Sequence, residues 1–330
     1  MIPQGPIYAS LRQQVLDAFP DDGAYSSLAS FRMSEWFRKA AYTVTSTGNK
    51  TFHVQTNIVD LARVHLFEIE LLLNHCVEHL AEMECFQRAH KYRSEAWQVV
   101  TIYYFGFFAA QALLRMLGTP IVFIKKDDLK TVKELSPLGI APGAGTYQIT
   151  KIPTVFAATA EYNFSRIEER VHDATWICLL KALEKQRKTS FPSPNAQEIM
   201  LYDSLSTHVM FRKYTDYRWP SLIRTKANYE PGYAYQAASH ANVCQCSKTI
   251  IRWNDPKKRG IVGLLNAAAN ECSSRKDDFS RDVQLMHDVS RTIFVLLKTL
   301  YLDLQNRRKM DKRPEQKRVT LLKDLADYVV

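Results

Sequence analysis

An unbroken run of eighteen uncharged residues, Trp97 to Leu114 (WQVVTIYYFGFFAAQALL), limits the possible folds of this chain more than any other feature. Its length reaches the lower edge of what a membrane-spanning helix needs. Two glutamines, a threonine and a glycine interrupt it, Arg115 follows directly, and no second apolar stretch accompanies it. We therefore expect a helix buried on all sides in a protein core. A membrane-associated protein is the alternative, and fractionation with membranes would reveal it.

The segments around this run predict further helices. From Ile58 to Arg93 the apolar residues recur at the 3.6-residue period of an amphipathic helix, and Phe279 to Leu304 shows the same spacing. Gly118 followed by Pro120 is typical of a helix end. We also expect helices at Ser26 to Lys39, Tyr162 to Arg187, Ala196 to Met210 and Ile261 to Cys272.

Two short runs rich in β-branched residues, Pro120 to Lys126 and Thr146 to Phe156, predict a small sheet or an extended insert. The predicted fold class is therefore mainly α, a helical bundle with a small β or extended insert. Residues 1–57 would form an N-terminal helical extension. Residues 58–305 would form the helical core with the insert near 120–156, and residues 306–330 a basic C-terminal tail with a short helix.

The formal net charge of +10 favours a polyanionic partner, most commonly nucleic acid. Part of the surplus lies in the segment RRKMDKRPEQKR near the C-terminus. Such a charge run is most often a solvated face or linker, with nucleic-acid contact as the alternative. The candidate nucleic-acid-binding residues there are Arg307, Arg308, Lys309, Lys312, Arg313, Lys317 and Arg318.

Cysteine usage and missing motifs exclude several chemistries. The six cysteines, without a visible secretion signal, indicate reduced thiols and a cytoplasmic protein. His240, Cys244, Cys246 and Cys272 are of the right types for zinc, but the spacing matches no common zinc module, so we predict no metal. The sequence contains no Gly-rich phosphate loop, HExxH or GxSxG, and we predict no cofactor.

Two segments together carry a family resemblance. Thr101 to Gly118 reads as aromatic pairs followed by small and aliphatic residues, and Ile223 to Tyr235 brings Arg224 with Asn228 and Tyr229. This combination resembles the HEPN superfamily of prokaryotic helical proteins, which includes ribonuclease toxins and components of antiphage defence. The resemblance implies a HEPN-like core and work on nucleic acid, RNA rather than DNA, in antiviral defence.

The chemistry that the resemblance implies is metal-independent RNA cleavage, in which a 2′-hydroxyl attacks the adjacent phosphate. Arg224 would hold the phosphate oxygens, and a group with a pKa near neutrality would move the proton. Tyr229 stands where the family's catalytic His would be, and a tyrosine hydroxyl is a poorer base at neutral pH than an imidazole. Arg281 with His287 is a second candidate pair, but six positions of helix, about 600° of rotation, place the two off a common face.

Each site residue also has a purely structural interpretation. Arg224 can anchor the turn that follows it, and His287 can be an ordinary helix residue. The sequence therefore leaves open whether the chain is an enzyme. The alternative is a non-catalytic binding or scaffold subunit of a multi-protein defence complex, with a homodimer or a partner encoded nearby. Both functions require the aromatic segment and Arg224 to meet in space.

Overall fold

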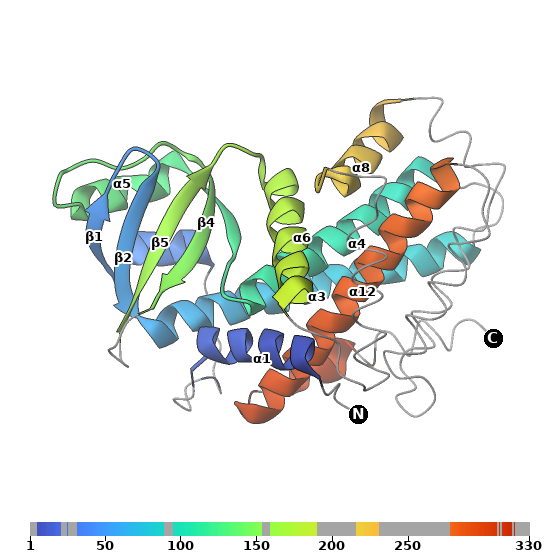
Figure 1. Cartoon of the computed structure of the whole chain (residues 1–330), viewed down its shortest axis with the longest axis horizontal. Coiled ribbons are helices and arrows are strands. Elements are labelled where there is room, and N and C mark those ends of the chain that lie inside the picture. Colours follow the sequence, from blue (N-terminus) through green and yellow to red (C-terminus); the bar gives the residue numbers. More distant parts are fainter. Residues whose placement is uncertain are drawn as a thin grey trace.

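The protein combines an antiparallel sheet with a group of long helices (Figure 1). The computed structural model describes residues 5–20, 25, 32–88, 95–153, 159–189, 216–230, 278–308, 310, 312–318 and 320. The strands are β1 (Thr43–Thr47), β2 (Thr51–Asn57), β3 (Ile121–Ile124), β4 (Gly145–Ile152) and β5 (Thr159–Ile167). The helices are α1 (Pro6–Ala18), α2 (Met33–Lys39), α3 (Ile58–Arg88), α4 (Glu95–Met116), α5 (Lys126–Leu135), α6 (Val171–Thr189), α8 (Trp219–Tyr229) and α12 (Asp278–Arg307).

The predicted fold class, mainly α, is wrong, because a five-stranded sheet in the order β1-β2-β5-β4-β3 makes the protein a mixture of α and β structure. All of its neighbouring strands are antiparallel. The N-terminal segment before Ile58 does not form only helices, since it supplies β1 and β2. The predicted insert supplies β3, β4 and also helix α5, and β5 completes the sheet between β2 and β4.

Strand β5 replaces the first part of a predicted helix. We expected a helix from Tyr162 onward, but the chain is extended up to Ile167 and α6 begins at Val171. Burial alternates along the strand with Ala160, Tyr162 and Phe164 inward, which is the period of a half-buried strand.

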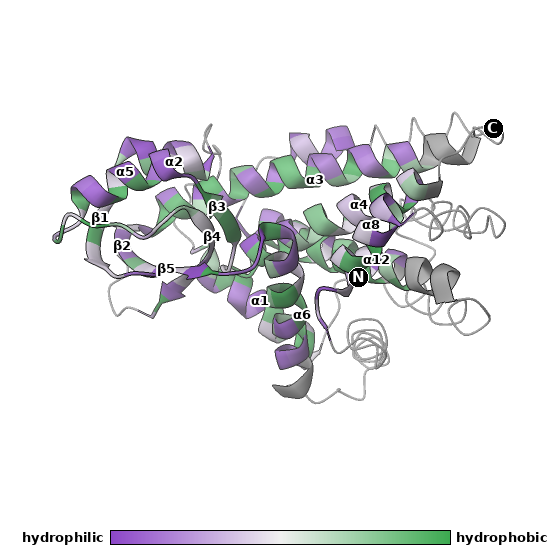
Figure 2. Ribbon diagram, turned by 90° about the horizontal axis from the view of Figure 1, so that it is seen from above, coloured by the Kyte–Doolittle hydropathy of each residue, from purple (hydrophilic) through white to green (hydrophobic). Residues whose placement is uncertain are grey.

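The sheet buries one face against helices. Figure 2 shows α2 and α5 along that face, and Trp36 from α2 and Val132 from α5 share a hydrophobic cluster with Phe52 of β2. Phe52 stacks on Phe164 of the adjacent strand with ring centroids 4.6 Å apart. Cross-strand aromatic pairs of this kind stabilise a sheet, so these rings hold β2 and β5 in register.

Helix α4 is the centre of the helical part, as its uncharged sequence predicts. It packs against α3, α12, α6 and α8. Its window Ala96–Met116 is long and apolar enough to cross a membrane, yet 89% of that window is buried inside the protein. Gly106 allows α12 to approach closely, because a methyl group there would overlap Ser290. The predicted end is confirmed: Gly118 has a φ of 71° and donates to the Arg115 carbonyl.

A buried ion pair joins α3 to α4 where the helical part meets the sheet. Arg115 Nε lies 2.8 Å from Glu68 Oε2, and both side chains are largely enclosed. Burial alone would raise the pKa of Glu68, but the Arg115 charge and the hydrogen bond from the Met33 backbone hold it below its usual value. The carboxylate therefore stays ionised beside its cation.

Candidate functional site

The aromatic helix and Arg224 meet in space, so the spatial expectation drawn from the sequence is confirmed. Nη2 of Arg224 donates to the Tyr104 hydroxyl at 3.1 Å, and the guanidinium carbon lies 5.8 Å from the centroid of that ring. Arg224 lies within helix α8 rather than in a turn. Pro220 occupies the first turn of α8, where its missing N–H and fixed φ suit a helix start.

Arg224 stands at the edge of the buried face of α8. Ile223 and Ala227 on either side of it are buried, whereas Arg224 is half-buried. Its Nε atom is enclosed and has no hydrogen-bond partner among the residues that the structure describes. Within the described part of the chain Arg224 forms no ion pair, and its guanidinium donates to the Tyr104 hydroxyl. A half-buried cation without a carboxylate is costly, and an anionic ligand would satisfy it.

An imidazole that the sequence did not single out lies beside this cation. His172 occupies the first turn of α6, and its ring stacks on Phe107 of α4 with centroids 4.3 Å apart. Burial lowers the pKa of His172, and the positive charge of Arg224 lowers it further, while Asp173 opposes the shift. The imidazole is therefore neutral at pH 7, the state that can accept a proton.

A buried hydrogen-bond network orients His172. The Tyr103 hydroxyl lies 2.9 Å from Nδ1 of His172 and 3.2 Å from the Ser221 hydroxyl, and it accepts from the Trp176 indole N–H at 3.4 Å. Two assignments of protons satisfy these groups: Tyr103 accepts from Nδ1–H and donates to Ser221, or it accepts from Ser221 and donates to Nδ1. In both, Nδ1 of His172 is engaged by Tyr103, and the first leaves Nε2 as the basic nitrogen. We call Tyr103, Tyr104, His172, Ser221 and Arg224 the Arg224 site.

Two histidines from α3 extend the aromatic surface next to this site. His79 stacks on Tyr104 with centroids 5.9 Å apart, and His75 stacks on Phe108 at 4.9 Å. Nδ1 of His79 lies 3.0 Å from Oε2 of Glu82, and Nδ1 of His75 lies 2.8 Å from Oε2 of Glu78. On the α3 side, the Arg224 site therefore borders stacked aromatic and imidazole rings, and hydrogen bonds to glutamates fix the orientation of both imidazoles.

The other predicted catalytic residues lie outside the Arg224 site. Asn228 and Tyr229 belong to α8 with Arg224, but both are exposed, Tyr229 to 73%. His287 is buried at 1% exposure in α12. Arg281 belongs to the same helix, and its side chain lies outside the described residues. Of this set, Arg224 contacts Tyr104 of the aromatic helix, and the imidazole that joins the same group of side chains is His172.

The predicted basic tail is partly tied into the fold. Nη1 of Arg318 donates to Glu70 at 2.6 Å and to Asn74 at 2.9 Å, and its side chain is enclosed. Arg308 donates to the Phe19 carbonyl, and Arg307 pairs with Asp303. Lys312, Arg313 and Lys317 are exposed, whereas Lys309 lies outside the described residues.

The prediction that the chain holds no metal can be compared with the structure only over the described residues. His240, Cys244, Cys246 and Cys272 lie outside the described residues. Within the described ranges no three His, Cys, Asp or Glu side chains gather as a metal site would require.

Comparison of the chain with protein-family models, with curated proteins and with solved structures finds no match. The Arg224 site therefore has to be interpreted from its own geometry. Its strongest property is a guanidinium without a carboxylate partner in the described ranges, beside an imidazole that Tyr103 holds in place.

Proposed function

We propose that this protein binds RNA at the Arg224 site and cleaves it without a metal ion. The observation that carries the proposal is the position of Arg224, a half-buried cation with no ion-pair partner in the described residues, next to the neutral ring of His172. A phosphodiester supplies the missing negative charge, and the planar guanidinium matches two phosphate oxygens.

In the proposed reaction His172 Nε2 takes the proton from a ribose 2′-hydroxyl. The 2′-oxygen then forms a bond to the adjacent phosphorus, the bond from phosphorus to the 5′-oxygen breaks, and the leaving oxygen takes a proton from water. Arg224 stabilises the charge that gathers on the phosphate oxygens. This step uses the tautomer in which Nδ1–H donates to Tyr103, and Tyr103 and Ser221 are positioning residues because their hydrogen bonds hold the imidazole in place.

The decisive experiment incubates the purified chain with labelled single-stranded RNA and tRNA in EDTA. We expect products ending in a 2′,3′-cyclic phosphate. His172→Ala should lower the rate by about 10²- to 10⁴-fold, the usual contribution of a general base. Arg224→Gln should lower it by roughly 10²-fold or more, as loss of a charge-stabilising donor does. Lys226→Gln, which removes an exposed cation from the same helix, is the matched control and should cleave normally.

A second candidate function is RNA binding without cleavage, as a subunit of a multi-protein defence complex. The observation that favours it is Tyr229, which stands exposed on α8 where the HEPN resemblance places a catalytic His. In that case the wild-type protein would bind labelled RNA without cleaving it, and Arg224→Gln would lose the binding. Absence of both binding and cleavage would contradict both functions.

A further inference from the structure

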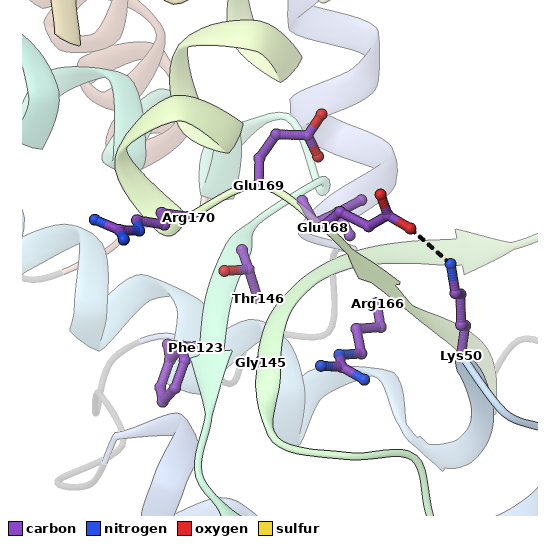
Figure 3. Close-up of a pocket in the computed structure, with 9 residues that line it drawn as sticks. Lys50, Phe123, Gly145, Thr146, Arg166, Glu168, Glu169 and Arg170 are labelled. Atoms are coloured by element: carbon purple, nitrogen blue, oxygen red, sulfur yellow. Dashed lines mark hydrogen bonds and ion pairs between the residues drawn. The ribbon is translucent and has the colours of Figure 1, made fainter.

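The cavity where the sheet passes into α6 does not gather its functional groups around one ligand. It measures about 320 Å³, and Lys50 Nζ lies 2.8 Å from Oε1 of Glu168 in its wall (Figure 3). Figure 3 also shows the Arg170 side chain directed away from Arg166. The sheet register places Phe123 and Arg166 on opposite faces of the sheet. The ligand-binding groups next to the Arg224 site are arranged differently.

The rings beside the Arg224 site form one continuous row. His75 and His79 are one helical turn apart on α3, and Tyr104 and Phe108 are one turn apart on α4, so each pair projects from one side of its helix. Phe108 stacks on both imidazoles, with its centroid 4.9 Å from that of His75 and 5.5 Å from that of His79. Tyr104 stacks on His79 and on Phe108 at 5.9 Å each. We call these four side chains the ring row.

The two ends of the ring row differ. Its planes are nearly parallel, since the angles between stacked partners run from 14° to 29°. One end joins the Arg224 site, because the Tyr104 hydroxyl accepts a hydrogen bond from Arg224. The other end is His75, which stacks on Phe108 and on no other ring in the described part of the chain. One face of the His75 imidazole is therefore without a ring partner among those residues.

Hydrogen bonding orients His75 without covering its faces. The His75 side chain is 48% exposed, whereas that of His79 is 20% exposed. A carboxylate can only accept, so Nδ1 of His75 carries the proton that it donates to Glu78 at 2.8 Å. A hydrogen bond to a ring nitrogen lies in the plane of the ring, so Glu78 leaves both faces of the imidazole clear. The imidazole is thus held in one orientation with a face available for stacking.

The charges around the ring row select what can lie on His75. Glu78 and Glu82 stand beside the two imidazoles, with side chains that are 64% and 55% exposed. These carboxylates repel a phosphate. They would also lose their water against an apolar protein surface, which is costly. An uncharged flat ring meets neither penalty, and unpaired nucleic-acid bases stack on histidine and aromatic side chains in this way.

We propose that an unpaired base of RNA stacks on the open face of His75 and extends the ring row by one ring, which rests on the proposed binding of RNA at the Arg224 site. Two ring-to-ring steps, 5.9 Å and 4.9 Å, separate Tyr104 from His75, so the base belongs to a nucleotide close to the phosphate on Arg224 in the same strand. A base inside a duplex already stacks on both of its neighbours. The substrate class is therefore single-stranded RNA, with little preference for the identity of that base, because every base has a flat face.

Fluorescence anisotropy with the full chain and two labelled single strands tests this proposal. One strand is a 2′-fluoro oligouridylate, which lacks the hydroxyl that the proposed cleavage uses, so binding is measured without turnover. The other is an abasic strand of the same length, which keeps the phosphates and removes the rings. The wild type should bind the abasic strand about five- to hundredfold more weakly, the usual contribution of a stacked base.

Substitutions at His75 locate the base. His75→Ala should weaken the intact strand by about five- to hundredfold and leave the abasic strand unchanged. His75→Phe keeps a ring and should bind both strands like the wild type. The matched control is His53→Ala on β2, where Nδ1 also lies beside a glutamate, 3.4 Å from Oε1 of Glu161. It should bind both strands like the wild type.

Arg224→Gln separates this proposal from the proposed function. It should weaken both strands alike, because both keep their phosphates. If His75→Ala weakens the two strands equally or weakens neither, the base stacking is overturned, while binding that depends on Arg224 leaves the proposed function standing. If the wild type does not bind the intact strand, or binds it no better than Arg224→Gln does, the proposed function fails and the base stacking fails with it.

Discussion

Among the wholly or partly buried arginines in the described part of the chain, Arg115, Arg318 and Arg224 differ in what neutralises them. Arg115 is paired with Glu68 at 2.8 Å, and Arg318 with Glu70 at 2.6 Å. Arg224 has a tyrosine hydroxyl and an unused Nε instead. The paired arginines join helices inside the fold, whereas Arg224 lies half-open beside an imidazole. The comparison teaches that the two arginines that join helices each have a carboxylate, whereas Arg224 has none among the described residues and can take one from an external anion.

Breaking a neutralised pair should have the largest effect. Glu68→Ala leaves Arg115 buried without a counter-charge, and we expect a loss of about 3–5 kcal/mol in the free energy of unfolding. Urea denaturation measures it. Glu82→Ala removes an exposed carboxylate from the same helix and should cost less than about 1 kcal/mol. Equal losses in the two variants would show that the Arg115 pair has no special role.

Acid should destabilise the same region through a buried histidine. Burial lowers the pKa of His65, next to the Arg115 pair, to about 4. The unfolded chain binds this proton at the ordinary pKa, so stability falls as pH drops from about 6.5 and levels off below about 4, by roughly 3 kcal/mol in all. The difference in unfolding free energy between wild type and His65→Leu across this range measures it. A difference that does not change with pH would contradict the prediction.

The long helices could be predicted from the sequence because their apolar residues repeat at a period that few other structures produce. Helices α3, α4 and α12 follow this pattern through Leu66, Phe105 and Leu297, all fully buried. The sheet could not be predicted in the same way. Strand β1 is mostly polar with Val44 as its one buried residue, and the alternation in β5 continues directly into the helical spacing of α6.

The candidate site could be predicted only in part. The aromatic pairs of α4 and Arg224 could be predicted, because each is recognisable within a short stretch of sequence. His172 gave no signal, because a histidine in the first turn of a helix becomes significant only when folding brings it to Tyr103, 69 positions earlier in the chain. Contacts of this range depend on how helices pack, which no local pattern determines.

Removing the unpaired cation should hardly change stability. Arg224→Met leaves no buried carboxylate behind, and we expect the free energy of unfolding to stay within about 1 kcal/mol of wild type or to rise. Arg115→Met is the paired comparison. It leaves the Glu68 carboxylate buried without its cation and should lower the free energy of unfolding strongly. A loss at Arg224 as large as that at Arg115 would mean that Arg224 is a structural cation after all.

A carboxylate introduced next to Arg224 on the same helix should partly neutralise the Arg224 guanidinium and compete with RNA for it. Asn228 lies one turn further along α8 and is exposed, so Asn228→Asp places a negative charge within reach. A helical pair of this spacing is worth only a few tenths of a kcal/mol, so RNA affinity should fall by roughly two- to tenfold including repulsion of the phosphate. Asn228→Gln serves as the neutral control in a filter-binding assay. Unchanged affinity in Asn228→Asp would place the RNA elsewhere.

The salt dependence of RNA binding tests the role of Arg224 most directly. Each phosphate neutralised on a single strand contributes about −0.7 to the slope of log K against log salt concentration. We predict that Arg224→Gln binds single-stranded RNA more weakly than wild type and that the slope becomes shallower by about 0.7. Identical affinity and slope in the two proteins would contradict the account, because they would show that no phosphate meets Arg224.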